Sequence, residues 1–338
     1  MDEATNPVLV EVSRGAMVES RHRGAVAAVD SSGSVVFGRG AVGTEIFPRS
    51  AIKPLQALLL IESGAADRFG VTPEEIALAC ASHSAEPRHL SLVEHWLTKI
   101  GCSAADLECG PEPPRTPESI RDMVRDGTKP TPLHNNCSGK HAGFLTVAKH
   151  LGVPMKGYIE YAHPVQQYLR KILSEVFETD LETSPRGTDG CGIPVLAVRL
   201  DQLARGMAKL ADPSPESDKR RMAMLRIRQA MAAQPFLVAG TGRFTTAVTE
   251  ITGDRVLLKG GAEGVYCAAL PQQKLGIAIK IEDGAGRAAE VAMGALLQRF
   301  GVVGESEAAS LAKVLEPTVF NWAGTAVGQI RATESLSA

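Results

Sequence analysis

The 338-residue sequence has few aromatic residues, few cysteines, no excess of either charge and no long apolar run. With 36 basic against 38 acidic residues, its net charge of -2 provides no field that would gather nucleic acid or anionic lipid. No apolar run approaches the roughly 20 residues that span a bilayer, and the first residues lack the regions of a secretory signal. Six cysteines are too few for a disulfide scaffold. We therefore expect a cytoplasmic protein with reduced thiols that acts on a small neutral or zwitterionic partner, not on nucleic acid or a membrane.

The rest of the composition is that of a globular protein, with 44% hydrophobic and 22% charged residues. β-Branched runs between turn residues predict antiparallel strands near the N-terminus, at 8–12, 25–30 and 34–38. Strand patterns return at 256–260, 264–270 and 275–282, ahead of an amphipathic helix over 287–300. Helical patterns dominate the residues between, at 50–63, 73–82, 86–100, 116–126, 138–150, 164–178, 200–211 and 216–233.

Strands at both ends with helices between them predict an α/β protein of the α+β type. We expect an antiparallel sheet built from both chain ends and flanked by helices, with an inserted helical lobe. The whole chain, 1–338, would form one unit, with a sheet-containing part over 1–49 and 235–338 and a mainly helical lobe over 50–234. Clefts between lobes are preferred small-molecule sites, and Ser50 stands where the sheet passes into the lobe.

Ser50 and Lys53 lie three residues apart at the start of the first helical run, with Pro48 before them and Pro54 after them. Side chains at this spacing share one face of a helix. A serine hydroxyl is a weak nucleophile until a base removes its proton, and a neutral lysine amine can be that base. Such pairs occur by chance in long chains, so this one indicates catalysis only together with other motifs.

Two further stretches carry polar side chains. In CASHSAEPRH, 80–89, Ser82 and Ser84 are possible hydroxyl partners and His83 a possible base, although a polar loop with helix caps explains the pattern equally well. In KGGAEG, 259–264, Lys259 ends a predicted strand, and the glycines that follow let a ligand approach the backbone closely.

Cys137 and Cys191 are the two cysteines in polar, glycine-rich surroundings. Cys137 precedes a predicted helix, whose dipole favours a thiolate. Two thiolates and one nitrogen would give zinc three protein ligands and one open position. The nitrogen could come from His134, Lys140 or His141. The alternatives are a single catalytic thiol at Cys137 with one of the two histidines as base, and two thiols without a catalytic role.

Seven stretches follow one another from residue 48 to residue 284: PRSAIKPLQ, ASHSAEPRH, NNCSGKHAG, GTDGCGIP, AGTGRF, KGGAEGVY and IKIEDG. Together they resemble the rhizobial-type (class 3) L-asparaginases over nearly the whole chain. The resemblance implies a fold similar to the serine β-lactamases, the penicillin-binding proteins and a class of glutaminases. It implies hydrolysis of the side-chain amide of L-asparagine to L-aspartate and ammonia, and a homodimer.

The resemblance also implies roles for individual residues. Ser50, the nucleophile, and Lys53 match one Ser–Lys tandem of the family, and Ser82 and Lys259 match the second. Zinc would be an auxiliary cofactor held by Cys137, Lys140 and Cys191. Substrate binding would involve Arg49 at the carboxylate and Asp189 at the ammonium, with Lys140 beside them. The rival functions are a glutaminase, a penicillin-recognising type of serine hydrolase, and a noncatalytic zinc-binding or amino-acid-binding protein.

Overall fold

The computed structural model describes residues 6–337, so both ends of the predicted unit, residues 1–5 and 338, lie outside the described residues. The chain forms two compact units. Among the described residues, the sheet unit comprises 6–51, Val198–Asp212 and 247–337. The helical unit comprises Ile52–Ala197 and Pro213–Thr246.

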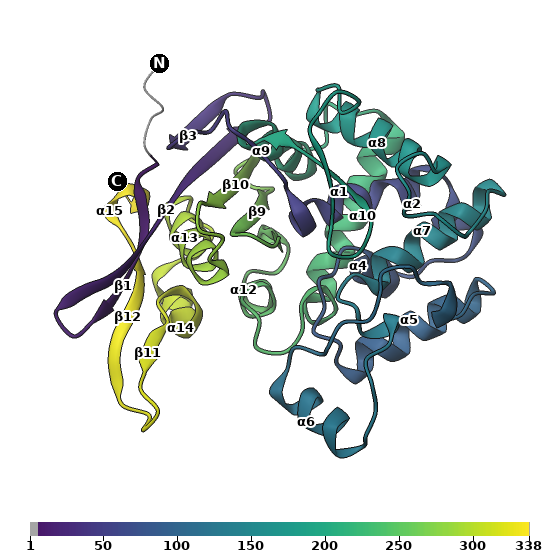
Figure 1. The fold of residues 1–338 in the computed structure, drawn as a ribbon. Coiled ribbons are helices and arrows are strands. Elements are labelled where there is room, and N and C mark those ends of the chain that lie inside the picture. Colours follow the sequence, from purple (N-terminus) through teal and green to yellow (C-terminus); the bar gives the residue numbers. More distant parts are fainter. Residues whose placement is uncertain (1–5, 338) are drawn as a thin grey trace. The chain divides into compact units, whose positions relative to one another are not determined.

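An eight-stranded antiparallel sheet is the centre of the sheet unit, in the order β11-β12-β1-β2-β10-β9-β8 with β3 also paired to β2. Figure 1 shows the N-terminal strands β1 and β2, in purple, beside the C-terminal strand β12, in yellow. The predicted antiparallel sheet from both chain ends is therefore confirmed. Its strands are β1 (Val8–Arg14), β2 (Met17–Asp30), β3 (Val35–Arg39), β8 (Leu257–Gly260), β9 (Val265–Leu270), β10 (Leu275–Ile281), β11 (Thr318–Phe320) and β12 (Ala326–Ala332). A small second sheet pairs β4 (Glu45–Ile46) with β7 (Val198–Arg199).

Helices pack on this sheet through small residues. A Cβ atom added to Gly276 of β10 would lie 2.0 Å from the Ala204 carbonyl oxygen, so the backbone of α9 rests directly on that strand. Helix α13 packs against β9, β10 and β12, and its buried face includes Ala288 and Ala292. The helices of this unit are α9 (Leu200–Ala211), α13 (Gly286–Arg299), α14 (Glu305–Leu315) and α15 (Glu334–Ser337), and α12 (Phe244–Thr252) enters it from the helical unit.

The helical unit contains most of the predicted helices. They are α3 (Ala65–Arg68), α4 (Pro73–Ala79), α5 (Pro87–Lys99), α6 (Pro117–Arg125), α7 (Ser138–Leu151), α8 (Pro164–Phe177), α10 (Asp218–Ala233) and α11 (Pro235–Val238), with a short hairpin of β5 (Arg186–Thr188) and β6 (Pro194–Leu196). The helix predicted over 50–63 is instead a 3₁₀ turn, η1 (Arg49–Ile52), followed by α1 (Lys53–Gln56) and α2 (Leu58–Glu62). The Leu60 amide bonds to Ala57, three residues back, and this tighter step interrupts the α-helical pattern.

Helices α4 and α7 meet at a glycine. A Cβ atom on Gly139 would lie 2.4 Å from the Leu78 carbonyl oxygen, so only glycine permits this approach. Because Ser82 follows α4 and Cys137 precedes α7, the contact brings two of the predicted motifs together within the helical unit. In the part of the chain that the structure describes, every helix is too short or too polar to cross a membrane.

Candidate active site

Ser50 lies in the 3₁₀ turn η1, directly before α1. Arg49, which precedes it, has φ +51°, a left-handed conformation that is uncommon outside glycine. Gly261, just after β8, packs against this turn within the sheet unit. A Cβ atom there would lie 2.9 Å from the Pro48 carbonyl oxygen and 3.1 Å from the Ala51 amide nitrogen. The glycine-rich turn predicted after Lys259 therefore supports the backbone that carries Ser50.

Lys259 lies on β8 of the sheet unit and is only 3% exposed. Its ammonium donates a 2.6 Å hydrogen bond to the Gly260 carbonyl oxygen. Cys267, its neighbour across the β8–β9 pair, is fully buried, and burial raises the pKa of that thiol. Lys259 is thus a buried lysine near the end of β8, two residues before Gly261.

Lys53 is fully buried and belongs to the helical unit. Its Nζ donates to the Ala81 carbonyl oxygen and, over 3.1 Å, to Ser82 Oγ. Local spacing points to Ser50 as the partner of Lys53, whereas within the helical unit the fold brings Lys53 to the serine of the second motif. A buried amine needs such acceptors, because an unpartnered polar group in the interior costs free energy.

Cys137, Lys140 and Cys191 also converge in the helical unit, and each is at most 4% exposed. Cys137 caps the N-terminus of α7, and Lys140 lies on its first turn. Cys191 lies in the turn between β5 and β6, which the left-handed Gly192 (φ +88°) closes. Lys140 Nζ donates to Cys191 Sγ over 3.0 Å, so the structure brings the three predicted zinc ligands together.

The electrostatics of this thiol–lysine cluster favour one thiolate. The pKa of Cys137 lies well below its usual range because Cys191 hydrogen-bonds to its sulfur and because Lys53 and Lys140 lie nearby. The pKa of Cys191 is raised by the same hydrogen bond and by burial. Burial acts to lower the pKa of Lys140, but the two sulfurs outweigh it and the net shift is upward. The cluster therefore pairs one negative sulfur with the buried ammonium of Lys140.

His134 and His141, the other two possible sources of the third ligand, hydrogen-bond to residues outside the cluster. His141 Nδ1 lies 2.7 Å from the Tyr158 hydroxyl, and burial holds the pKa of His141 well below its usual range. His134 contacts Thr131, with Nδ1 accepting from the Thr131 amide over 3.1 Å. Of the three nitrogens left open by the sequence, that of Lys140 is the one hydrogen-bonded to a cysteine of the cluster.

The cluster fits a zinc ion in the chemistry of its donors. Two buried sulfurs and one amine in mutual contact supply the soft and borderline ligands that zinc prefers. Among residues 6–337 no group of three His, Cys, Asp or Glu side chains is placed to hold a metal, so such a site depends on Lys140 as the third ligand.

Of the two predicted substrate contacts beyond this cluster, Asp189 lies two residues before Cys191 in the same turn. Its Oδ1 accepts from the Gly190 amide over 2.8 Å, and the carboxylate remains partly exposed. Arg49 is also partly exposed, in the sheet unit.

A comparison with protein families shows the family to which this chain belongs. The family model described as L-asparaginase II matches residues 10–332, which include every candidate site residue. The chain belongs to the L-asparaginase II family. It is therefore an amidohydrolase, and the resemblance to L-asparaginases is confirmed.

No curated protein matches the sequence of this L-asparaginase family member. Similar solved structures include the β-lactamase Mb2281c from Mycobacterium bovis, with 15% identity and a TM-score of 0.42 over 82% of this chain and 94% of that one. A β-lactamase from Sphaerobacter thermophilus has 15% identity and a TM-score of 0.42, over 83% of this chain and 92% of its own. Mglu has 14% identity and a TM-score of 0.45, over 88% of this chain and 72% of its own. The family match alone carries the assignment.

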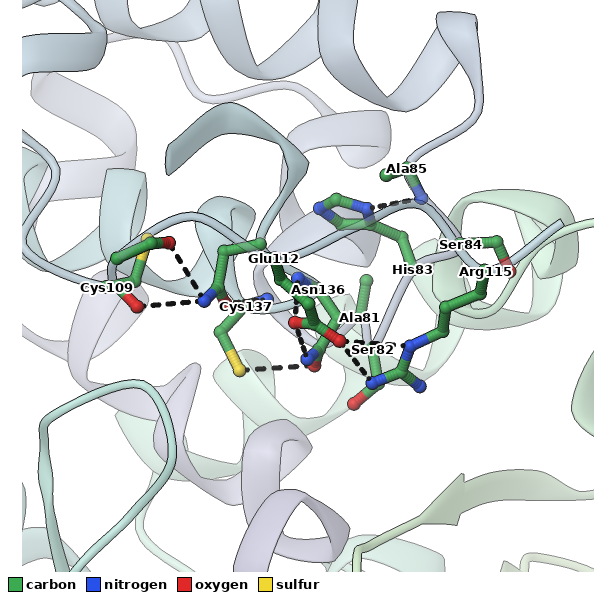
Figure 2. A network of polar contacts seen from close by, with 12 residues as sticks. Ala81, Ser82, His83, Ser84, Ala85, Cys109, Glu112, Arg115, Asn136 and Cys137 are labelled. Carbon is green, nitrogen blue, oxygen red and sulfur yellow. Dashed lines mark hydrogen bonds and ion pairs between the residues drawn. The ribbon is translucent and has the colours of Figure 1, made fainter. Parts of the chain in front are cut away.

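The sequence did not point to Glu112, which organises the polar surroundings of Cys137 in this amidohydrolase. Figure 2 shows Glu112 between Asn136 and Arg115. Glu112 Oε2 accepts from the Asn136 amide over 3.0 Å, and Oε1 accepts from Arg115 over 2.8 Å. The Arg115 amide in turn donates to the Ser84 carbonyl oxygen over 3.1 Å. Residues 110–119 are rich in proline, which is typical of a connector and gives no sign of these contacts.

Proposed function

We propose that this amidohydrolase hydrolyses the side-chain amide of L-asparagine to L-aspartate and ammonia, with Ser50 as nucleophile. Lys53 would accept the Ser50 proton as the oxygen attacks the amide carbon. Ser82 and Lys259 would deliver a proton to the departing ammonia, and water would then release aspartate from the acyl-enzyme. The observation that carries this proposal is the hydrogen bond from the buried Lys53 to Ser82 inside a chain of the asparaginase family.

Lys53 would act as a base in its neutral form, in which the nitrogen has two hydrogens and one lone pair. Its Nζ bonds to the Ala81 carbonyl oxygen and to Ser82 Oγ, and it also hydrogen-bonds to the Cys137 side chain. The proposal requires that the lone pair face Ser50 and accept its proton. Ser82, bonded to the same nitrogen, is placed to pass that proton onward.

A zwitterionic substrate needs one charged partner at each end. We assign the substrate carboxylate to Arg49 and its ammonium to Asp189, with Lys140 beside the substrate. These roles follow the resemblance, and the partial exposure of Arg49 and Asp189 supports them.

Zinc is the cofactor that we propose for Cys137, Lys140 and Cys191, with an auxiliary role. When bound, it would supply a positive charge that neutralises the Cys137 thiolate. We also propose a cytoplasmic homodimer, and light scattering of the purified chain in solution tests the dimer.

Ammonia release from L-asparagine and L-glutamine, together with the colour change of a chromogenic β-lactam, tests the function. We expect turnover with asparagine, and Ser50→Ala should retain less than about a hundredth of it, because loss of a nucleophile costs several orders of magnitude. Ser91→Ala, at an exposed serine of α5, is the matched control and should keep wild-type turnover. Faster release from glutamine would identify a glutaminase, and cleavage of the β-lactam a penicillin-recognising hydrolase. Binding of asparagine without ammonia release would identify a noncatalytic binding protein.

A further inference from the structure

His83 is a buried histidine that has no role in the proposed mechanism. It is 1% exposed, and its ring stacks on that of His89 with the centroids 5.0 Å apart. Figure 2 shows its ring turned toward Ala85, whose amide donates to Nδ1 over 3.1 Å. On its other edge, Nε2 lies 2.9 Å from Ser138 Oγ. His83 therefore bridges the segment after α4 and the first residue of α7.

These contacts fix the tautomer of His83. The Ala85 amide can only donate, so Nδ1 must present its lone pair, and the ring proton lies on Nε2, which donates to Ser138. Burial, with the nearby His89 and Lys53, holds the pKa of His83 well below its usual range, so the ring stays neutral. With one nitrogen occupied and the other protonated, His83 is unable to act as the base that its place beside Ser82 suggested.

The bridge joins two parts of the site. Ser82, the partner of Lys53, directly precedes His83, and Cys137 directly precedes Ser138. The His83 amide also donates to the Asn136 carbonyl oxygen over 3.2 Å. Ala85 has φ +57°, a strained conformation for a residue with a Cβ atom, and the bond to Nδ1 holds it there.

We infer that His83 is a positioning residue, which through Ser138 fixes the place of Ser82 relative to Cys137 and the thiol–lysine cluster. This inference rests on the proposed function. The serine that bonds to Lys53 and the sulfur beside Lys53 lie on different segments. Without the bridge, their separation would depend on the packing of Gly139 on Leu78, on the backbone bond to Asn136, and on the link from Asn136 through Glu112 and Arg115 to Ser84.

Two substitutions of His83, each of which keeps one of its two side-chain hydrogen bonds, test the two bonds separately. An asparagine keeps an oxygen near Nδ1 for the Ala85 amide but is too short to reach Ser138, whereas a glutamine places an amide NH₂ near Nε2. We expect His83→Asn and Ser138→Ala each to lower kcat on asparagine by roughly 10- to 100-fold, with KM within about threefold, because small misplacements act mainly on the chemical step. His83→Gln should recover much of this loss. The His83→Asn/Ser138→Ala double variant should be no worse than either single variant, since both remove one bond.

His163 offers a matched control in the same unit. Its Nδ1 accepts from the Val165 amide over 3.2 Å and its Nε2 lies 2.8 Å from the Pro154 carbonyl oxygen, so it makes the same two kinds of contact elsewhere. His163→Asn should lower thermal stability without changing kcat. If His83→Asn and Ser138→Ala likewise lower the melting temperature but keep more than half of the wild-type kcat, the bridge is only structural and the inference is wrong.

A wild-type protein that releases no ammonia would refute the proposed function and leave the bridge to be tested alone. Hydrogen exchange of the backbone amides serves that purpose. In His83→Asn, residues 82–85 and 136–141 should both exchange faster than in the wild type. Unchanged exchange over 136–141 would overturn the inference whatever the activity.

Discussion

Gly261 offers a direct test of whether the turn that carries Ser50 must be held in one place. A methyl group at this position would lie 2.9 Å from the Pro48 carbonyl oxygen, 3.1 Å from the Ala51 amide nitrogen and 3.3 Å from Ala51 Cβ. Two of these atoms are backbone, so no side-chain rotation relieves the contact. Since non-bonded atoms prefer separations of about 3.5 Å or more, the turn must shift by about half an ångström in Gly261→Ala.

The expected loss follows from that shift. Overpacking of this kind costs about 1–3 kcal/mol of folding free energy. A displacement of about 1 Å at a reacting group can cost about 100-fold in rate, so about half that distance predicts roughly a tenfold lower kcat. Gly261→Ala should therefore lose activity well beyond what its lower stability explains.

Steady-state ammonia release at a temperature where the variant remains folded measures this effect. Gly286→Ala is the control, because a Cβ atom there meets nothing within 4 Å and the residue begins a helix. It should match the wild type in kcat. If Gly261→Ala stays within threefold of the wild-type kcat, the turn does not need this support and the reasoning fails.

Three further predictions concern the helical unit. Arg220→Met should lower the free energy of unfolding in urea by about 3–5 kcal/mol, because it strands the buried Glu62, which now accepts two bonds from Arg220 at 2.8 and 3.0 Å; a loss below about 1 kcal/mol would contradict this. Burial acts to raise the pKa of Glu112, but hydrogen bonds from Asn136 and Arg115 outweigh it and hold the pKa below the usual range. Its carboxylate therefore stabilises the fold above the ordinary carboxyl pKa of about 4.3, and this contribution is lost as the pH falls through the lower folded pKa. Glu112→Gln should flatten the acid limb of a pH series of urea melts, and an unchanged limb would show that Glu112 is not its source. Cys191→Ser should weaken zinc binding at least tenfold in competition with a chelator, since a hydroxyl is a poor zinc ligand; equal affinity would place the metal elsewhere.

Much of the fold could be predicted because its strands alternate or are uniformly apolar. In β10 every residue except Lys280 is buried, and β9 is buried throughout, so their apolar runs mark them as central strands. Strand β12 escaped prediction, because its side chains are mostly half-buried or exposed and carry no period. Its place in the sheet comes from pairing with β1, which sequence spacing does not encode.

The sequence names candidate site residues, but it does not name the contacts between them. Spacing along a helix pairs Lys53 with Ser50, whereas the bond from Lys53 to Ser82 spans 29 positions and requires α1 and the end of α4 to be packed together. The choice of the third zinc ligand among His134, Lys140 and His141 likewise depends on contacts that the sequence does not give. Lys140 and His141 are adjacent in sequence, yet one helical step turns His141 toward Tyr158 and leaves Lys140 on the sulfur of Cys191.

Lys53 connects the thiol–lysine cluster with Ser82, the serine of the second motif. The same side chain hydrogen-bonds to Ser82 and helps to hold the pKa of the Cys137 thiol below its usual range. Because Lys53 is fully buried, little solvent screens these interactions. A change at the thiol–lysine cluster is therefore expected to reach Ser82 through Lys53, although the two lie on different segments of the chain.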